Sequence, residues 1–244
     1  MLRTTPFTSA SFELLGGIHA SPTKQFYQFH REEFKAHVEE PFQQVLRLVA
    51  EALPPLITAL METEDHLFSR FLKNDYGRGG AWDFYWGAFY TGGGRRSEGA
   101  QLYLCIDRNV LKYGFYIGVY AGEHHRRFTR NCRACASELL PYLRRVLPET
   151  IVSFDTNDGG VRISPGVART GVRVTWESYL RNPYLVENDV CIRTPKQEIL
   201  TTTERDLVTK IAEVHVKLFP LVLLAVHDDP LPLIRRHLST VGLV

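Results

Sequence analysis

The chain has 244 residues, 44% of them hydrophobic and 23% charged, with a formal net charge of +2, which is ordinary for a globular protein with a substantial core. Four cysteines in a chain of this size do not make a disulfide framework, and the N-terminus lacks the long apolar region of a secretory signal. The longest apolar run, residues 218–226, is too short to span a membrane, so we expect a cytoplasmic protein.

Residues 8–64 are predicted to be helical. Apolar residues at helical spacing follow Ser21 and Pro22, and a proline fits the first turn of a helix because its missing N–H has no partner to lose there. Charged residues fill the other positions, which is typical of a solvated helix face. We expect these helices to cover one side of the sheet that follows.

Residues 66–121 are predicted to form the sheet core, with strands near 66–74, 82–91, 100–107 and 113–120. These segments are rich in aromatic and β-branched residues and are separated by glycine-containing turns. In the third segment apolar and polar residues alternate, as in a strand with one buried face. The short connections favour antiparallel neighbours, because a parallel crossover needs a dozen residues or more.

The rest of the chain is predicted to be a helix over 122–147 and a mixture of hairpin and helices over 150–244. The sequence NDGG within 150–164 supplies residues that tolerate positive φ in a tight turn. The segment TTTERDLVTKIAEVHVKLFPL starts with a capping-type threonine, with Glu204 close behind, and is predicted to be a long helix. No change in composition marks a domain boundary. The sequence therefore predicts a single α+β domain over 1–244, an antiparallel sheet flanked by helices.

Several segments match part of a chemical motif, and none is complete. Cys132 and Cys135 have the spacing of half a zinc site, but they share the inward face of a predicted helix, so we interpret them as core residues. The segment 155–160, DTNDGG, fails as a calcium loop because glycines occupy required ligand positions. No GxxxxGK[ST], GxSxG or HExxH motif is present. We predict no catalytic residue, metal or cofactor, and the chain is not itself a P-loop NTPase.

The basic charge is concentrated where the aromatic residues are densest. Residues 70–133 contain eleven Lys or Arg and five Asp or Glu, a net charge of +6 in a chain whose total is +2. Proteins that read unstacked bases use cationic side chains for phosphates and aromatic rings for the base. We therefore predict that Lys73, Arg78, Arg95 and Arg96 hold a nucleic-acid backbone and that Trp82, Tyr85 or Trp86 contacts a base.

Three segments resemble the N-terminal region of bacterial McrB-like AAA+ GTPases of modification-dependent restriction systems: KNDYGRGGAWDFYWGAFY, the strand pair QLYLCIDRNVLKYGFYIG, and RRFTRNC. The helix FHREEFKAHVEEPFQQVL and the late IAEVHVKLFPL are similar too, so the resemblance covers residues 20–225. The early helix with RFLKND also resembles a family of uncharacterised bacterial proteins. The first resemblance implies a DNA-recognition domain for a modified base, partnered by an AAA+ GTPase motor and a nuclease subunit. This chain lacks the motor, so restriction activity is not expected of it alone.

Two other functions stay open at this point. The chain could be an enzyme that acts on a nucleotide or modified base, with Asp75 or Asp83 as the acid or base. It could also be a protein-interaction domain that positions a partner. Binding without turnover would separate DNA recognition from the enzyme, and an absence of salt-dependent DNA binding would favour the interaction domain.

Overall fold

The computed structural model describes residues 5–91, 98–118, 120–155, 174–183 and 189–243. Within them, six strands form one antiparallel sheet in the order β1-β2-β3-β4-β6-β5, which confirms the predicted α+β class. The strands are β1 (Met61–Glu62), β2 (Phe84–Thr91), β3 (Ala100–Asp107), β4 (Val110–Ile117), β5 (Ser153–Asp155) and β6 (Asp189–Pro195). The predicted strands at 82–91, 100–107 and 113–120 correspond to β2, β3 and β4.

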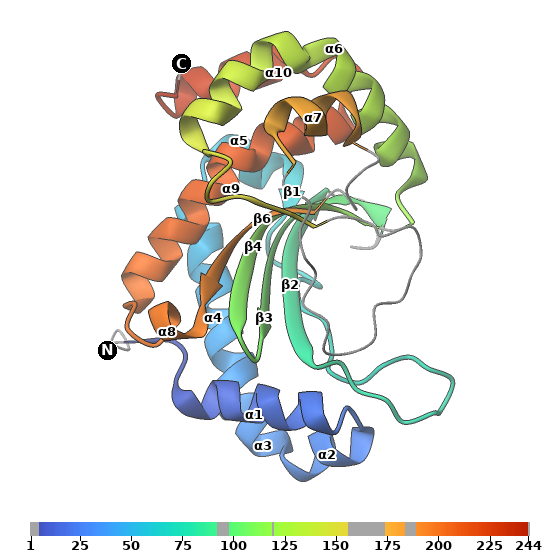
Figure 1. Ribbon diagram of the computed structural model, residues 1–244, viewed down its shortest axis with the longest axis vertical. Helices are drawn as coiled ribbons and strands as arrows, with labels where there is room; N and C mark the ends of the chain where they lie inside the picture. The colour runs from blue at the N-terminus through green and yellow to red at the C-terminus, as the bar shows by residue number, and fades with distance from the viewer. Residues whose placement is uncertain (1–4, 92–97, 119, 156–173, 184–188, 244) are drawn as a thin grey trace.

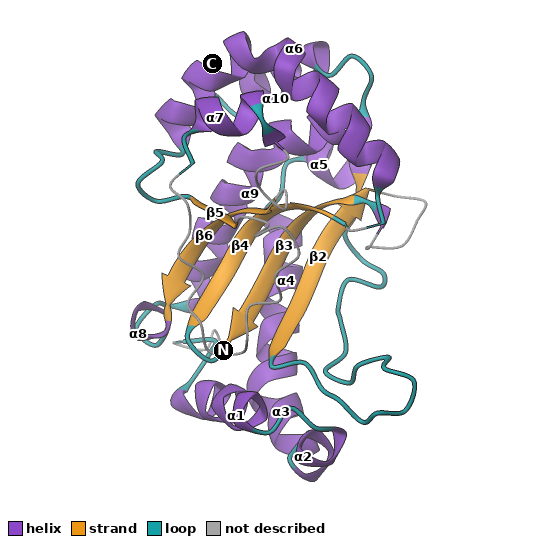
Figure 2. Cartoon of the chain, turned by 45° about the vertical axis from the view of Figure 1, so that its right-hand side comes forward, coloured by secondary structure: helices purple, strands orange, loops and turns teal. Residues whose placement is uncertain are grey.

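Helices pack on one face of the sheet and around both of its ends (Figures 1 and 2). Helices α4 and α9 cover the face, while α6, α7 and α10 form a layer at one end and α1 to α3 lie at the other. The helical elements are α1 (Ser9–Ala20), α2 (Lys24–Phe29), α3 (Arg31–Phe34), the π-helical turn η1 (Lys35–Glu39), α4 (Glu40–Ala52), α5 (Pro55–Leu60), α6 (Gly122–Val146), α7 (Trp176–Arg181), α8 (Lys196–Ile199), α9 (Glu204–Val226) and α10 (Leu231–Thr240). Within the described residues, no helix combines the length and apolar character that crossing a bilayer requires.

The two faces of the sheet carry different side chains because successive strand residues point to opposite sides. Leu102, Leu104 and Ile106 face the helices and are fully buried in the main core. Tyr103 and Cys105 lie on the other face, in a smaller cluster with Ala88 and Cys191. Tyr103 is also fully buried, so this second face is not an exposed surface at its centre.

Two glycines allow close packing around the sheet. A Cβ atom at Gly114 in β4 would lie 2.0 Å from the carbonyl oxygen of Val190 in β6, so no side chain fits there. A Cβ atom at Gly87 in β2 would lie 2.8 Å from Leu46 and 2.9 Å from Phe42, both in α4. Glycine at position 87 therefore lets α4 pack closely against β2.

The prediction of a regular strand at 66–74 was wrong. Residues 67–69 join the edge of β2 through backbone hydrogen bonds from Ser69 N to Trp86 O and from Ala88 N to Leu67 O, and the Ser69 hydroxyl accepts a hydrogen bond from Trp86 N. The following residues leave β2 and pair instead with residues 80–82. Because the segment divides its hydrogen bonds between two partners, it forms isolated bridges rather than a strand.

Other bounds differ from the predictions as well. Residues 61–62, within the stretch 8–64 that was predicted to be helical, form β1, and β4 runs over 110–117 rather than 113–120. The helix predicted to start at Ser21-Pro22 begins at Lys24, because the Thr23 side chain accepts a hydrogen bond from Phe26 N and acts as the cap. The predicted hairpin over 150–164 contributes β5, which pairs with β6, and its NDGG turn lies outside the described residues. The long helix after Thr203 is confirmed as α9, with Thr203 capping it through Asp206 N.

Candidate nucleic-acid interface

Residues 71–82 form a short hairpin next to the start of β2, which we call hairpin 71–82. Its two arms are joined by backbone hydrogen bonds from Lys73 N to Gly80 O (3.0 Å) and from Trp82 N to Phe71 O (2.7 Å). The tip turns at three residues with positive φ: Tyr76 (59°), Gly77 (86°) and Gly79 (76°). Gly77 and Gly79 of the sequence GRGG thus serve the turn, since that backbone conformation costs glycine little.

Contacts with the N-terminal helices hold hairpin 71–82 in place. Lys24 N donates to Gly79 O (2.6 Å) and Ala81 N donates to Pro22 O (2.9 Å), which adds the segment between α1 and α2 to the edge of the hairpin. The hairpin therefore cannot shift without also moving the start of α2.

Both acidic residues that were considered as an enzyme's acid or base are engaged within the fold. The Asp75 carboxylate accepts a hydrogen bond from Gly80 N at 2.7 Å and closes the hairpin turn. Asp83 lies 2.7 Å from His19 Nδ1 and ties the hairpin to α1. These contacts give each carboxylate a structural role.

The cationic side chains of the same region are not neutralised in this way. Arg70, Lys73 and Arg78 form no ion pair with any residue that the structure describes. Lys73 Nζ lies 4.5 Å from the ring centroid of Trp82, a cation–π contact. Trp82 is 42% exposed and Tyr76 is 97% exposed. The structure thus brings Lys73, Arg78 and Trp82 of the predicted site together on one hairpin.

Trp86 lies farther along, on the second face of the sheet. Trp82 contacts Phe84 (ring centroids 5.3 Å apart), and Trp86 stacks on Tyr103 at 4.1 Å with an interplanar angle of 7°. One face of the Trp86 indole is therefore already covered by Tyr103, and Tyr116 meets Trp86 edge-on. Trp86 is only partly buried, but a base could stack on one side of its ring at most.

Tyr85 points to the opposite face from Trp86, and that face is the helix-covered core. Only 2% of Tyr85 is exposed, and its ring stacks on Phe71 with centroids 5.0 Å apart. Its hydroxyl accepts a hydrogen bond from Gln43 Nε2 (3.1 Å). Tyr85 therefore does not belong to the exposed surface on which Trp82 lies. Arg95 and Arg96, the remaining predicted residues, lie outside the described residues.

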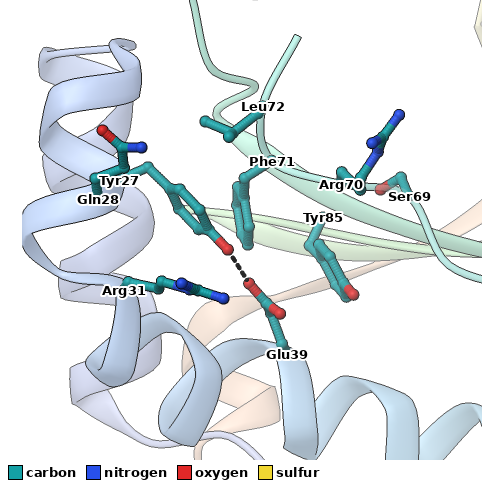
Figure 3. A pocket seen from close by; sticks show the side chains of 9 residues that line it. All are labelled: Tyr27, Gln28, Arg31, Glu39, Ser69, Arg70, Phe71, Leu72 and Tyr85. Carbon is teal, nitrogen blue, oxygen red and sulfur yellow. Dashed lines mark hydrogen bonds between the residues drawn. The ribbon is translucent and has the colours of Figure 1, made fainter. Parts of the chain in front are cut away.

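The sequence did not predict the cavity of about 350 Å³ that lies between α2, η1 and the first arm of hairpin 71–82 (Figure 3). Its lining includes three aromatic rings, one carboxylate and two guanidinium groups: Tyr27, Phe71, Tyr85, Glu39, Arg31 and Arg70. Tyr85 is thus a predicted base-contacting residue that lines this cavity.

Glu39 is the polar centre of this cavity. It ends the π-helical turn η1, a geometry that often marks functional positions in helices. Tyr27 Oη donates a hydrogen bond to Glu39 Oε1 at 2.8 Å, and burial together with this bond raises the pKa of Tyr27. Within the described residues, Glu39 Oε2 accepts no hydrogen bond. The run of charges around Glu39 is typical of a solvated helix face, so no sequence signal indicates this role.

The predicted core position of the two cysteines is confirmed. Cys132 and Cys135 in α6 are 0% and 3% exposed, and burial raises the pKa of both thiols. In the part of the chain that the structure describes, no three His, Cys, Asp or Glu side chains are placed to hold one metal ion.

No protein-family model matches this sequence, and no curated protein matches it. The resemblance to McrB-like proteins therefore stays a prediction.

Proposed function

We propose that this chain is a DNA-binding specificity module that holds the nucleic-acid backbone with hairpin 71–82 and contacts a base through neighbouring aromatic side chains. The observation that supports this most directly is the state of the charges. Both acids of the region, Asp75 and Asp83, are engaged in the fold, whereas Arg70, Lys73 and Arg78 have no ion partner among the described residues.

Unpaired cations beside exposed aromatic rings suit a polyanion whose bases can stack. Each phosphate neutralised by a Lys or Arg releases a counterion, which supplies affinity without sequence preference. A base that stacks on an aromatic ring adds about 1–3 kcal/mol. Trp82 is the best placed ring for this, because it is exposed and lies under the Lys73 ammonium.

The biological role that we propose is recognition of modified DNA for a restriction or defence system. This part of the proposal rests on the sequence resemblance. In this proposal the ligand of the chain is DNA with a modified base, and its partners are an AAA+ GTPase motor and a nuclease subunit.

The test is to measure affinity for duplexes with unmodified, methylated, hydroxymethylated or glucosylated bases over a range of salt concentrations. Log affinity should fall linearly with log salt, and Arg78→Ala should flatten the slope by about 0.9. Arg181→Ala is the matched control, because Arg181 is exposed but pairs with Glu177 at 2.8 Å. A slope that Arg78→Ala leaves unchanged would contradict a phosphate contact at Arg78.

The same measurement applies to Arg95 and Arg96. Replacing both with alanine should flatten the salt slope by about two and weaken binding to all sequences alike. If neither this double variant nor Arg78→Ala changes the slope, the DNA-binding proposal for this region is wrong.

A further inference from the structure

We infer that the cavity beside hairpin 71–82 is a nucleobase site whose Glu39 carboxylate selects guanine. The inference rests on the proposed function, because it gives that nucleic-acid surface the side chains with which one base is held. The cavity volume of about 350 Å³ is in the lower part of the range of roughly 300–1,000 Å³ that is typical of small-molecule sites. The site therefore suits a small planar ligand.

Three aromatic rings form one wall of the cavity. Tyr27 and Phe71 have ring centroids 5.3 Å apart at 30°, and Phe71 and Tyr85 have centroids 5.0 Å apart at 19°. The rings come from α2, the hairpin and β2, so three separate elements converge on this wall (Figure 3). Because the three rings stack on one another, a flat heteroaromatic ring can bury apolar surface against the parts of this stack that line the cavity.

The carboxylate of Glu39 determines which edge a base must present. An ionised carboxylate only accepts hydrogen bonds, and the Tyr27 hydroxyl already binds Oε1 and orients the group. The ligand must therefore bring N–H donors to Glu39. Guanine offers two adjacent donors, N1–H and the 2-amino group. Adenine and cytosine place an acceptor nitrogen beside their amine, and thymine flanks its one N–H with carbonyl groups.

The guanidinium groups that line the cavity favour a nucleotide over a cationic ligand. Aromatic rings with a carboxylate would also suit a quaternary ammonium group. Arg31 and Arg70 argue against this, because both are exposed, line the cavity and have no ion partner among the described residues. Two such guanidinium groups repel a cation and attract the phosphate that accompanies a nucleobase.

Guanine joined to phosphate can reach the cavity from two sources, a free guanine nucleotide or a guanine base turned out of a DNA strand. Both present the same edge to Glu39. The experiment therefore has one arm for each source.

The first arm measures the binding of GMP and IMP by calorimetry, since IMP differs only by lacking the 2-amino group. GMP should bind about tenfold more tightly, because a hydrogen bond to a charged acceptor is lost with IMP. Glu39→Gln should abolish this difference, while its amide oxygen can still accept from Tyr27. Glu40→Gln is the matched control, because it removes the same charge one residue along, at an exposed side chain outside the cavity. The comparison of GMP with IMP needs no variant, so a misfolded Glu39→Gln protein would not leave the inference untested.

The second arm uses thymine oligonucleotides with one central guanine or one hypoxanthine. A preference for guanine of about tenfold that Glu39→Gln removes, with the salt slope unchanged, would assign the site to a base within a strand. A preference seen with GMP alone would assign it to a free nucleotide. Salt-dependent oligonucleotide binding with no guanine preference in either arm would overturn the pocket assignment only. Guanine preference for GMP with no oligonucleotide binding would overturn the proposed DNA function and leave the pocket standing.

Discussion

Hairpin 71–82 and helix α6 both carry basic residues, but their charges are in different states. In α6, Arg127 pairs with Glu123 and with Asp228, and Arg130 pairs with the same Asp228 at 2.7 Å. Arg144 lies 3.5 Å from Glu177. On the hairpin side, Arg70, Lys73 and Arg78 have no ion partner among the described residues.

The difference shows that a local excess of positive charge does not measure the charge that is available to a ligand. The block of +6 over residues 70–133 contains hairpin 71–82 and the first part of α6. Half of the six arginines in α6 attach the helix to its neighbours in ion pairs, and Arg145 donates to the Leu243 carbonyl. Of the six, Arg126 and Arg133 have neither an ion pair nor a side-chain hydrogen bond within the described ranges. The proposed interface is therefore assigned to the hairpin.

The largest effect should be a loss of folding stability at low pH. Acid should destabilise α9, the helix on which α6 packs, whereas the Lys and Arg side chains of the hairpin stay charged. His215 in α9 is fully buried with its Nε2 3.1 Å from Tyr103 O, and burial lowers its pKa to about 4. The unfolded chain has a His pKa of about 6.5, so below that pH the unfolded state binds more protons. Stability is therefore present above pH 6.5 and is lost as the pH falls toward 4, by up to ~3 kcal/mol from His215.

Urea unfolding at pH 7, 5.5 and 4.5 measures this loss. His237 should add to it in the same direction, because burial also lowers its pKa. A His215→Gln variant, which keeps a donor for Tyr103 O, should show a flatter profile. A wild-type protein that is equally stable at all three pH values would contradict neutral burial of these histidines.

The next effect compares two pairs of unpaired cations. Replacing Lys73 and Arg78 with alanine should weaken DNA binding about tenfold at moderate salt and flatten the salt slope by roughly 1.8. Replacing Arg126 and Arg133 in α6 with alanine should change the DNA affinity by no more than about twofold and should leave the salt slope nearly unchanged. Filter binding at several salt concentrations measures both. Equal losses for the two double variants would remove the distinction between the regions.

A smaller effect should follow when α6 arginines are released. Asp228 accepts from both Arg127 and Arg130, which lowers its pKa. Asp228→Asn should therefore free two guanidinium groups and tighten nonspecific DNA binding a few-fold at low salt. Asp229→Asn is the control, because it removes the same charge at an exposed neighbour that has no ion pair among the described residues. If both variants bind DNA equally, the ion pairs with Asp228 are not what keeps the α6 arginines from binding DNA.

The smallest effect concerns Tyr85, which belongs to the core behind the hairpin. Tyr85→Phe keeps the ring on Phe71 and removes the hydroxyl that accepts from Gln43. We expect a stability loss of about 1 kcal/mol or less and unchanged preference among modified duplexes. Thermal melts and the duplex series measure the two quantities. Tyr85→Ala is a poor probe, since emptying a buried aromatic site costs about 3–5 kcal/mol. A changed preference in Tyr85→Phe would show that the hydroxyl contacts the base.

The central strands could be predicted because the pattern that identifies them is local. Leu102, Leu104 and Ile106 alternate with Tyr103 and Cys105, and the sheet places them on opposite faces as that alternation requires. The segment 66–74 has a similar composition but divides its hydrogen bonds between β2 and residues 80–82. Composition cannot reveal that choice of partner.

The site was only partly predictable for the same reason. The placement of Lys73, Arg78 and Trp82 on one structure follows from short sequence distances and glycine-rich turns. The opposite orientation of Tyr85 follows from strand alternation, but its burial depends on Phe71 and Phe42, which other elements supply. The cavity around Glu39 joins residues from 27 to 85, and a helix pattern read at regular spacing assigns Glu39 to the solvated face.

The direction in which Glu39 faces depends on the number of residues in the π-helical turn η1. A π turn accommodates one more residue than the α-helical turn that it replaces. Deleting one residue there would let α3 and α4 run as one regular helix, and the part before the deletion would rotate by about 100° relative to the part after it. Tyr27 and Glu39 would then no longer face each other, although neither had been substituted. A homologous chain with every lining residue intact but a helix one residue shorter should therefore lack the cavity. When sequences are aligned with this one, a single gap between residues 35 and 39 would be as informative about the site as a substitution at Glu39.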